Sequence, residues 1–192
     1  MLIGVSGYAR SGKDSFADAL CASVPWSKKV AFADKLRELT MAIYPDTNAL
    51  VTARGWDQAK SISTTRERLQ LLGETCRRVF GQDVWADALL REINPRQFTV
   101  VSDVRYRNEA QAIRRRGGVL IRIERPGVGP INDHISEHDL DGWTDWDAII
   151  HNDGNLQKLD RIAQEWGRRA GRPQHNKAHI RGAINRTVGI GI

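Results

Sequence analysis

With 192 residues, 41% of them hydrophobic and 27% charged, the chain has the length and composition of one soluble globular domain with a sizeable core. No apolar run approaches the roughly 18 residues that cross a bilayer, and the N-terminus lacks the basic start of a secretion signal, so we exclude a membrane span and expect a cytoplasmic protein. Cys21 and Cys76 lack metal-ligand spacing, which favours reduced core residues over a metal site.

The first predicted elements flank a glycine-rich loop, residues 7–12. An apolar run over residues 2–5 predicts a strand before it, and apolar residues at helical spacing predict a helix after it. In this context the pattern G-x-x-x-x-G-K predicts a phosphate-binding loop, because inward-turned N–H groups and a helix N-terminus attract anions. The candidate phosphate ligands are Gly7, Ser11, Gly12, Lys13, Asp14 and Ser15.

Asp14 stands where this pattern usually has the Ser or Thr that ligates Mg²⁺. Two interpretations of Asp14 stay open. Its carboxylate could approach Mg²⁺ directly or through a water, or it could cap the helix and be stabilised by the helix dipole. A plain glycine-rich turn capped by Asp14 is the structural alternative to a phosphate site.

Helices dominate the next part of the chain. A short strand over residues 29–32 leads to a helix that Asp34 is expected to cap. Residues 45–64 show no clean period and are interpreted as a mobile connection. Two further helices are expected: one carrying Leu69, Leu72, Cys76 and Phe80 on one face and ended by Gly81, and one over about 84–93.

Strands and helices alternate in the second half of the chain. The predicted elements are a buried strand over 98–102 that ends at Asp103, a helix with Ala110 and Ile113, a strand over 119–123, a loop or lid over 126–146, a strand over 148–150, and a helix with Leu156, Leu159, Ala163 and Trp166 on one face. This alternation predicts an α/β fold with a five-stranded, mainly parallel sheet. Ligands bind at the carboxyl ends of such strands, where the sequence places charged and small polar residues.

Basic residues accumulate at the end of the chain. Removing the six that follow Glu165 from the 29 Lys and Arg leaves 23, equal to the 23 Asp and Glu, so the net charge of +6 belongs to the tail. The tail could contact nucleic acid or a second subunit, as in a homodimer. A solvated extension is the commoner case. The six residues are Arg168, Arg169, Arg172, Lys177, Arg181 and Arg186.

Seven sequence blocks, in order, resemble the phage-type deoxynucleoside monophosphate kinases, a branch of the P-loop NMP kinases. The blocks are S-G-x-x-R-S-G-K-D at 6–14, A-F-A-D-x-L-R-E at 31–38, R-E-x-L-Q-x-L-G at 66–73, G-x-D-V-W at 81–85, D-V-R-x-x-N-E-A at 103–110, H-x-S-E at 134–137 and N-D-G at 152–154. Together they span about residues 2–165.

The resemblance implies a P-loop NTPase fold in which ATP, with Mg²⁺, phosphorylates a deoxynucleoside monophosphate to the diphosphate by in-line transfer. It implies a kinase domain over residues 1–166, with an NMP-binding segment at about 34–94 and a lid at about 125–146, followed by a tail over 167–192. A phage-encoded enzyme of this kind would act in the host cytoplasm.

The resemblance also implies roles for individual residues. Lys13, Arg10, Asp103 and Arg125 would be catalytic, and Asp14 and Asp103 would face the metal. The acceptor would be bound by Asp34, Arg37, Arg66, Gln70, Trp85 and Arg105. Asn152, Asp153 and Gly154 would lie at the adenine, and His134, Ser136 and Glu137 would belong to the lid.

Structural alternatives stand beside several of these roles. Asp34 and Asp103 could cap helices, Arg66 and Gln70 could form a solvated helix face, and Trp85 could be a core residue. His134 could be simply exposed, and residues 152–154 could form a plain turn. For function, the alternatives are a P-loop kinase acting on another small phosphorylated acceptor, since the Gly-Lys-Asp loop is also similar to phosphomevalonate kinase, and a nucleotide-binding module that engages nucleic acid through its tail.

Overall fold

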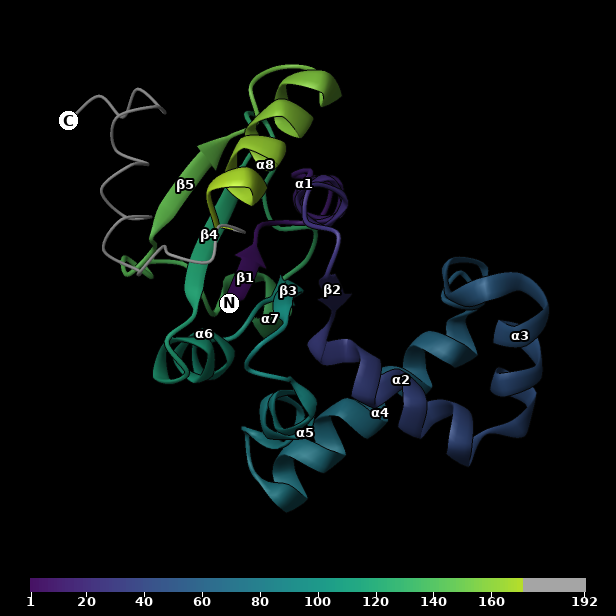
Figure 1. Cartoon of the computed structure of the whole chain (residues 1–192). Coiled ribbons are helices and arrows are strands. Elements are labelled where there is room, and N and C mark those ends of the chain that lie inside the picture. The colour runs from purple at the N-terminus through teal and green to yellow at the C-terminus, as the bar shows by residue number, and fades with distance from the viewer. Residues whose placement is uncertain (171–192) are drawn as a thin grey trace. The chain divides into compact units, whose positions relative to one another are not determined.

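The computed structural model describes residues 1–170 (Figure 1). They divide into two compact units. One comprises Met1–Val30 together with the described chain from Ile93, and the other is Ala31–Glu92. No helix among the described residues is long and apolar enough to cross a membrane.

The first unit is built on a five-stranded sheet in which every pair of neighbouring strands is parallel. The strand order is β2-β3-β1-β4-β5, which places β1 at the centre. This confirms the α/β class and the parallel sheet. The strands are β1 (Leu2–Ser6), β2 (Ser27–Val30), β3 (Phe98–Val104), β4 (Val119–Glu124) and β5 (Ala148–His151).

Strand β3 is longer than expected. Ser6 pairs with Val104, so the ladder continues past Asp103. The prediction that Asp103 closes this strand, or caps the next helix, is therefore wrong: Asp103 lies inside β3, close to its carboxyl end.

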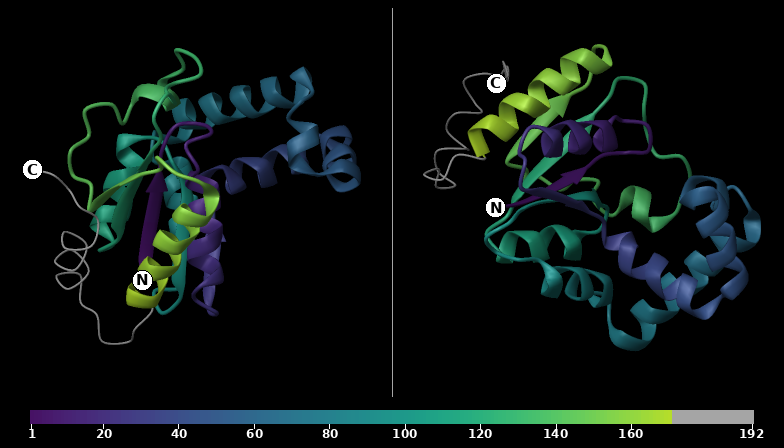
Figure 2. Two further views of the ribbon diagram at one scale, coloured as in Figure 1. Left: turned by 90° about the horizontal axis from the view of Figure 1, so that it is seen from above. Right: turned by 45° about the vertical axis from the view of Figure 1, so that its right-hand side comes forward.

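Helices cover both faces of the sheet (Figure 2). Alternate residues of a strand point to opposite faces. Ile3 and Val5 pack in one core with α1 (Lys13–Ala22) and α8 (Leu156–Ala170), which lie side by side. Gly4, between them, faces Ile113 of α6 (Arg107–Arg115) on the other side, where an added Cβ would lie 2.5 Å from the Ile113 Cδ1 atom.

Helix α8 buries most of its predicted apolar face. Leu159, Ala163 and Trp166 are buried as expected, whereas Leu156, the first residue of the helix, is exposed. The helix continues to Ala170. Gly167 allows α8 to pack closely against Ser23, because an added Cβ at this position would lie 1.7 Å from the Ser23 hydroxyl oxygen. The rest of the basic tail, residues 171–192, lies outside the described residues.

The second unit consists of the helices α2 (Phe32–Ile43), α3 (Pro45–Ala59), α4 (Ser63–Phe80) and α5 (Val84–Glu92). The interpretation of residues 45–64 as a mobile connection is wrong, because most of them form α3. Pro45 is accommodated at the start of this helix. Gly55, at φ 75°, then interrupts it and breaks the hydrophobic period.

The N-cap of α2 is Ala31, so the prediction that Asp34 is the N-cap is wrong. Asp34 instead accepts a hydrogen bond from the Ala31 backbone N–H at 2.8 Å, as the third helical residue does in a capping box. Gly81 ends α4 as expected, at φ 103°, although Phe80 of its apolar face is exposed. Both cysteines are free; Cys76 is buried and Cys21 is half-buried.

Candidate functional site

The glycine-rich loop joins β1 to α1 at the carboxyl end of the central strand. Gly7 has a φ of 152°, Arg10 of 67° and Gly12 of 96°. A Cβ at Gly7 would lie 2.6 Å from the carbonyl oxygen of Ile123, and a Cβ at Gly12 would lie 2.6 Å from Nδ2 of Asn152. Both glycines are therefore required by backbone conformation and by the close approach of neighbouring segments.

Lys13, the first residue of α1, is only 7% exposed. Its Nζ lies 2.9 Å from a carboxylate oxygen of Asp14, whose side chain is 64% exposed. An ammonium group close to a helix N-terminus, which itself carries partial positive charge, is stabilised by an anion. Lys13 and the helix end together favour an anionic ligand at the glycine-rich loop.

Asp14 does not cap α1. The N-cap is Gly12, and Asp14 is the second residue of the helix, with its carboxylate directed to Lys13. The interpretation of the loop as a turn capped by Asp14 is therefore wrong. The position of Asp14 in the first turn of α1 fits a carboxylate that is stabilised by the helix dipole. Within residues 1–170, no group of three or more His, Cys, Asp and Glu side chains could hold a metal ion.

The loop is instead braced by Asn152, which follows β5. This residue is 8% exposed, and its Nδ2 donates a hydrogen bond to the carbonyl oxygen of Ser11 at 2.8 Å. Its backbone N–H donates to the carbonyl oxygen of Glu124 at 2.6 Å. The buried side chain therefore supports the loop, and the expected role of Asn152 at the adenine stays a prediction.

We expect Asn152→Ala to lower the free energy of unfolding by about 1–3 kcal/mol, because the buried Ser11 carbonyl would lose its donor. For a chain of this size, each kcal/mol corresponds to a fall of roughly 2–4 °C in Tm by calorimetry. Asn48→Ala is the matched control, since Asn48 is exposed on α3, and its Tm should stay within about 1 °C of the parent. An Asn152→Ala protein as stable as this control would contradict the bracing role.

Asp103 and Arg105 lie at the carboxyl end of β3, beside the glycine-rich loop of β1. The backbone N–H groups of Arg105 and Tyr106 both donate to Oε2 of the buried Glu109, at 2.9 and 3.1 Å. Nη1 of Arg105 lies 2.5 Å from Oε1 of Glu137. The backbone and the guanidinium of Arg105 are thus both held by carboxylates.

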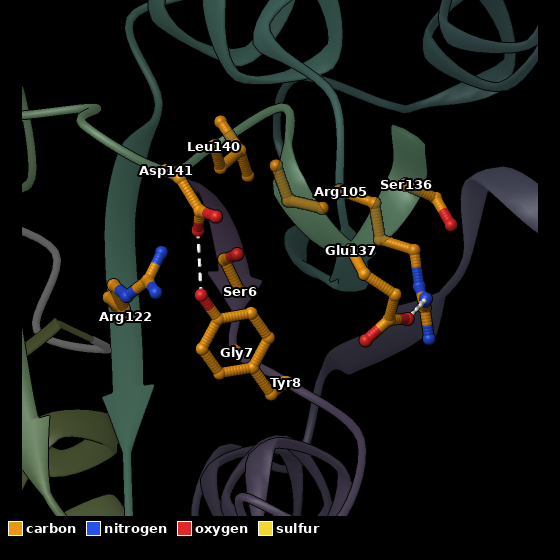
Figure 3. A pocket seen from close by; sticks show the side chains of 10 residues that line it. Ser6, Gly7, Tyr8, Arg105, Arg122, Ser136, Glu137, Leu140 and Asp141 are labelled. Carbon is orange, nitrogen blue, oxygen red and sulfur yellow. Dashed lines mark hydrogen bonds and ion pairs between the residues drawn. The ribbon is translucent and has the colours of Figure 1, made fainter. Parts of the chain in front are cut away.

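A pocket lies at the carboxyl ends of β1, β3 and β4, next to α7 (Ile135–His138) (Figure 3). The Tyr8 hydroxyl donates to Asp141 at 2.6 Å. The guanidinium carbon of Arg122 lies 5.2 Å from the Tyr8 ring centroid and 5.6 Å from that of Trp146. The residues that line the pocket are Ser6, Gly7, Tyr8, Val104, Arg105, Arg122, Ser136, Glu137, Leu140 and Asp141.

Three residues of this pocket were not predicted as site residues from the sequence: Tyr8, Arg122 and Asp141. Arg122 had a signal, because it is a charged residue inside the otherwise apolar run of residues 119–123. Tyr8 occupies a variable position of the loop pattern, and Asp141 lies in a segment without periodicity, so the sequence contains no signal that marks either residue.

The predicted lid segment contains α7, and hydrogen bonds form between residues of this segment. His134 caps this short helix: the Ser136 backbone N–H donates to Nδ1 of His134 at 3.2 Å, and the Ser136 hydroxyl lies 2.9 Å from the same nitrogen. Asp139 accepts a hydrogen bond from the backbone N–H of Arg107 at 2.7 Å. The segment is thereby tied to α6.

We expect His138 to titrate above its ordinary value. A hydrogen bond with Asp141, at 3.0 Å from Nδ1, raises the pKa of His138. The sign follows from linkage: the stabilisation is present below the unfolded-state pKa and is lost as the pH rises through the folded-state pKa. An NMR titration should therefore show the elevated pKa, and Asp141→Asn should lower it. An unchanged His138 titration in that variant would contradict the pairing.

In the second unit, several predicted acceptor residues have partners of their own. Arg37 pairs with Asp34 at 2.8 Å. Arg66 donates to the carbonyl oxygen of Lys60 at 3.1 Å and is exposed on α4, as is Gln70 one turn later. Trp85 is buried, and its Nε1 donates to the carbonyl oxygen of Gly73 at 3.3 Å, which favours the core interpretation over base stacking.

The remaining predicted site residues lie at the carboxyl edge of the sheet. Arg125 follows β4 and is exposed, as is Arg10 in the glycine-rich loop. Asp153 pairs with Lys158 at 2.6 Å, and this hydrogen bond lowers the pKa of Asp153. Gly154 is exposed beside the same lysine, and Ser15 is half-buried in the first turn of α1.

The chain is similar to known proteins. Residues 56–162 match the family model of deoxynucleotide monophosphate kinase. A relative from Acanthamoeba polyphaga mimivirus, with the provisional name of deoxynucleotide monophosphate kinase, is 27% identical over 181 residues, covering 83% of this chain and 92% of the relative. The family model spans more than half of the chain and includes β3, the Arg105 and Glu137 positions and β5. The chain therefore belongs to the deoxynucleotide monophosphate kinase family of phosphotransferases.

Proposed function

We propose that this enzyme transfers the γ-phosphoryl group of ATP to a deoxynucleoside monophosphate, which yields the deoxynucleoside diphosphate and ADP. The observation that best supports this proposal is the position of Lys13. It is buried at the N-terminus of α1, directly after a loop whose glycines have positive φ angles. Phosphoryl transfer needs positioning and charge neutralisation more than covalent chemistry. Backbone N–H groups of the loop, Lys13 and Arg10 would neutralise the donor phosphates.

On the acceptor side, Arg105 would hold the monophosphate. Its side chain is 34% exposed, and a planar guanidinium suits a phosphate that must be kept in line for attack. In the second unit, the exposed Arg66 and Gln70 lie four residues apart and so share one face of α4. They would contact the acceptor phosphate and a base edge.

Asp14 and Asp103 offer the hard oxygen donors that Mg²⁺ prefers, and the largely exposed Asp14 carboxylate is open to a ligand. Mg²⁺ usually takes one or two carboxylates together with waters and substrate phosphates, and Asp14 and Asp103 would supply these carboxylates. When bound, it would neutralise charge on the donor phosphates. The residues of the 126–146 segment would exclude water during transfer.

A coupled assay of ADP release tests the proposal with dAMP, dGMP, dCMP, dTMP and their ribonucleotide counterparts as acceptors. We expect ATP-dependent turnover with at least one deoxynucleoside monophosphate and no comparable ADP release without an acceptor. Phosphomevalonate is included as an acceptor that is not a nucleotide, and turnover with it alone would favour the other kinase interpretation. ADP release that is indifferent to every acceptor would contradict the proposed function.

A further inference from the structure

Glu137 is an enclosed carboxylate in the pocket of Figure 3. Its side chain is 4% exposed, and Oε1 lies 2.5 Å from Nη1 of Arg105. Its Oε2 is buried and has no hydrogen-bond partner within the described part of the chain. A carboxylate removed from water in this way requires a cation, and Arg105 is the cation that it contacts.

Arg105 is consequently fixed at two points. Glu109 holds its backbone N–H from the first turn of α6, and Glu137 holds its guanidinium from α7. Figure 3 shows the guanidinium lying against the Glu137 carboxylate at the margin of the pocket. The two carboxylates belong to different helices of the first unit, so the position of Arg105 depends on the tertiary fold and not on one helix alone.

The pair leaves part of the guanidinium available. Arginine has five N–H donors in a planar fork, and the contact with Glu137 engages Nη1. The side chain remains 34% exposed, so other donors can reach a ligand. A flexible arginine loses side-chain entropy when it binds a phosphate, whereas an arginine already held by a buried carboxylate loses less.

We propose that Glu137 is a positioning residue, which orients the Arg105 guanidinium toward the acceptor phosphate. The inference rests on the proposed function, in which Arg105 binds that phosphate. It moves Glu137 from the expected lid over the donor phosphates to the acceptor side of the reaction. Glu137 acts through Arg105 and need not touch the nucleotide.

The test compares the Glu137→Gln variant with the parent, using the best acceptor of the nucleotide panel. Glutamine keeps the shape and one carbonyl acceptor but removes the charge. We expect the KM for the acceptor to rise roughly 5- to 20-fold, the range expected when a charged hydrogen bond becomes a neutral one. The KM for ATP should stay within about twofold, because donor contacts are unchanged. Equilibrium binding of the acceptor without ATP should weaken by the same factor.

Two further variants sharpen the test. Glu165→Gln removes the carboxylate of a matched pair with Arg169 on α8 and should leave both KM values unchanged. Combining Glu137→Gln with Arg105→Gln should weaken acceptor binding no more than Arg105→Gln alone, because Glu137 acts through that arginine.

A parent-like acceptor KM, or equal losses for both substrates, would overturn the positioning role while leaving the proposed function intact. A lower acceptor KM would also overturn it, since Glu137 would then sequester Arg105 from the phosphate. A parent enzyme without turnover on any acceptor would overturn the proposed function and, with it, this inference.

Discussion

Replacing Lys13 with alanine is expected to reduce phosphoryl transfer by roughly 10²- to 10³-fold or more, the range for losing one preorganised charge partner of a transition state. Lys13 is buried at the N-terminus of α1, so water has little access to it. Neither of its neighbours in the sequence is a lysine that could replace its charge. Its ammonium would face the phosphoryl group throughout transfer. The measurement is kcat/KM for ATP in the coupled assay.

Lys13→Met separates charge from packing, because methionine keeps most of the buried stem. Both variants should lose activity to a similar extent, and the methionine variant should retain a parent-like Tm. Lys28→Ala is the matched control: this lysine is exposed on β2 and its loss should leave kcat/KM unchanged. Near-normal turnover of Lys13→Met would show that the loop does not serve the reaction.

The second large effect is expected for Gly12→Ala. A residue with a Cβ at φ 96° pays about 1–2 kcal/mol for the left-handed backbone. The new methyl group would also lie 2.6 Å from Nδ2 of Asn152 and 3.0 Å from Leu159, an overpacking that typically costs about 1–3 kcal/mol. The contact would displace the residue that holds the Ser11 carbonyl, so we expect activity and stability to fall together.

Gly81→Ala separates the two contributions to this effect. Gly81 has a φ of 103°, but an added Cβ there meets nothing within 4 Å. Its loss of stability, measured by urea unfolding, should be limited to the backbone contribution and therefore smaller than that of Gly12→Ala. Equal losses in the two variants would contradict the proposed crowding between Gly12 and Asn152.

The parallel sheet could be predicted because its signals are local. Strands β3, β4 and β5 are short apolar runs, and the first glycine-rich turn follows a strand in the expected way. Helix α3 could not be predicted from periodicity, because Gly55 divides it and only a few of its residues are buried. Strands β3 and β4 could be recognised because residues on both of their faces are buried, whereas α3 buries few residues and its period is interrupted.

The candidate site was less predictable because its contacts join distant residues. Asn152 lies 141 positions from Ser11, and the N-D-G pattern by itself indicates only a turn. The Arg105–Glu137 pair spans 32 positions, and neither residue indicates the other. Sequence therefore located the residue types at the edge of the sheet, whereas their pairing depends on how β3, β5 and α7 meet the loop.

In the proposed reaction, the γ-phosphoryl group of ATP moves to a deoxynucleoside monophosphate. The most direct measurement supplies ATP labelled on its γ-phosphate together with unlabelled acceptor and separates the products by chromatography. We predict that the label appears in the deoxynucleoside diphosphate, in equal amount to the ADP formed, and that Lys13→Met abolishes this transfer. Label recovered as inorganic phosphate, or retained in ATP with every acceptor, would contradict the claim.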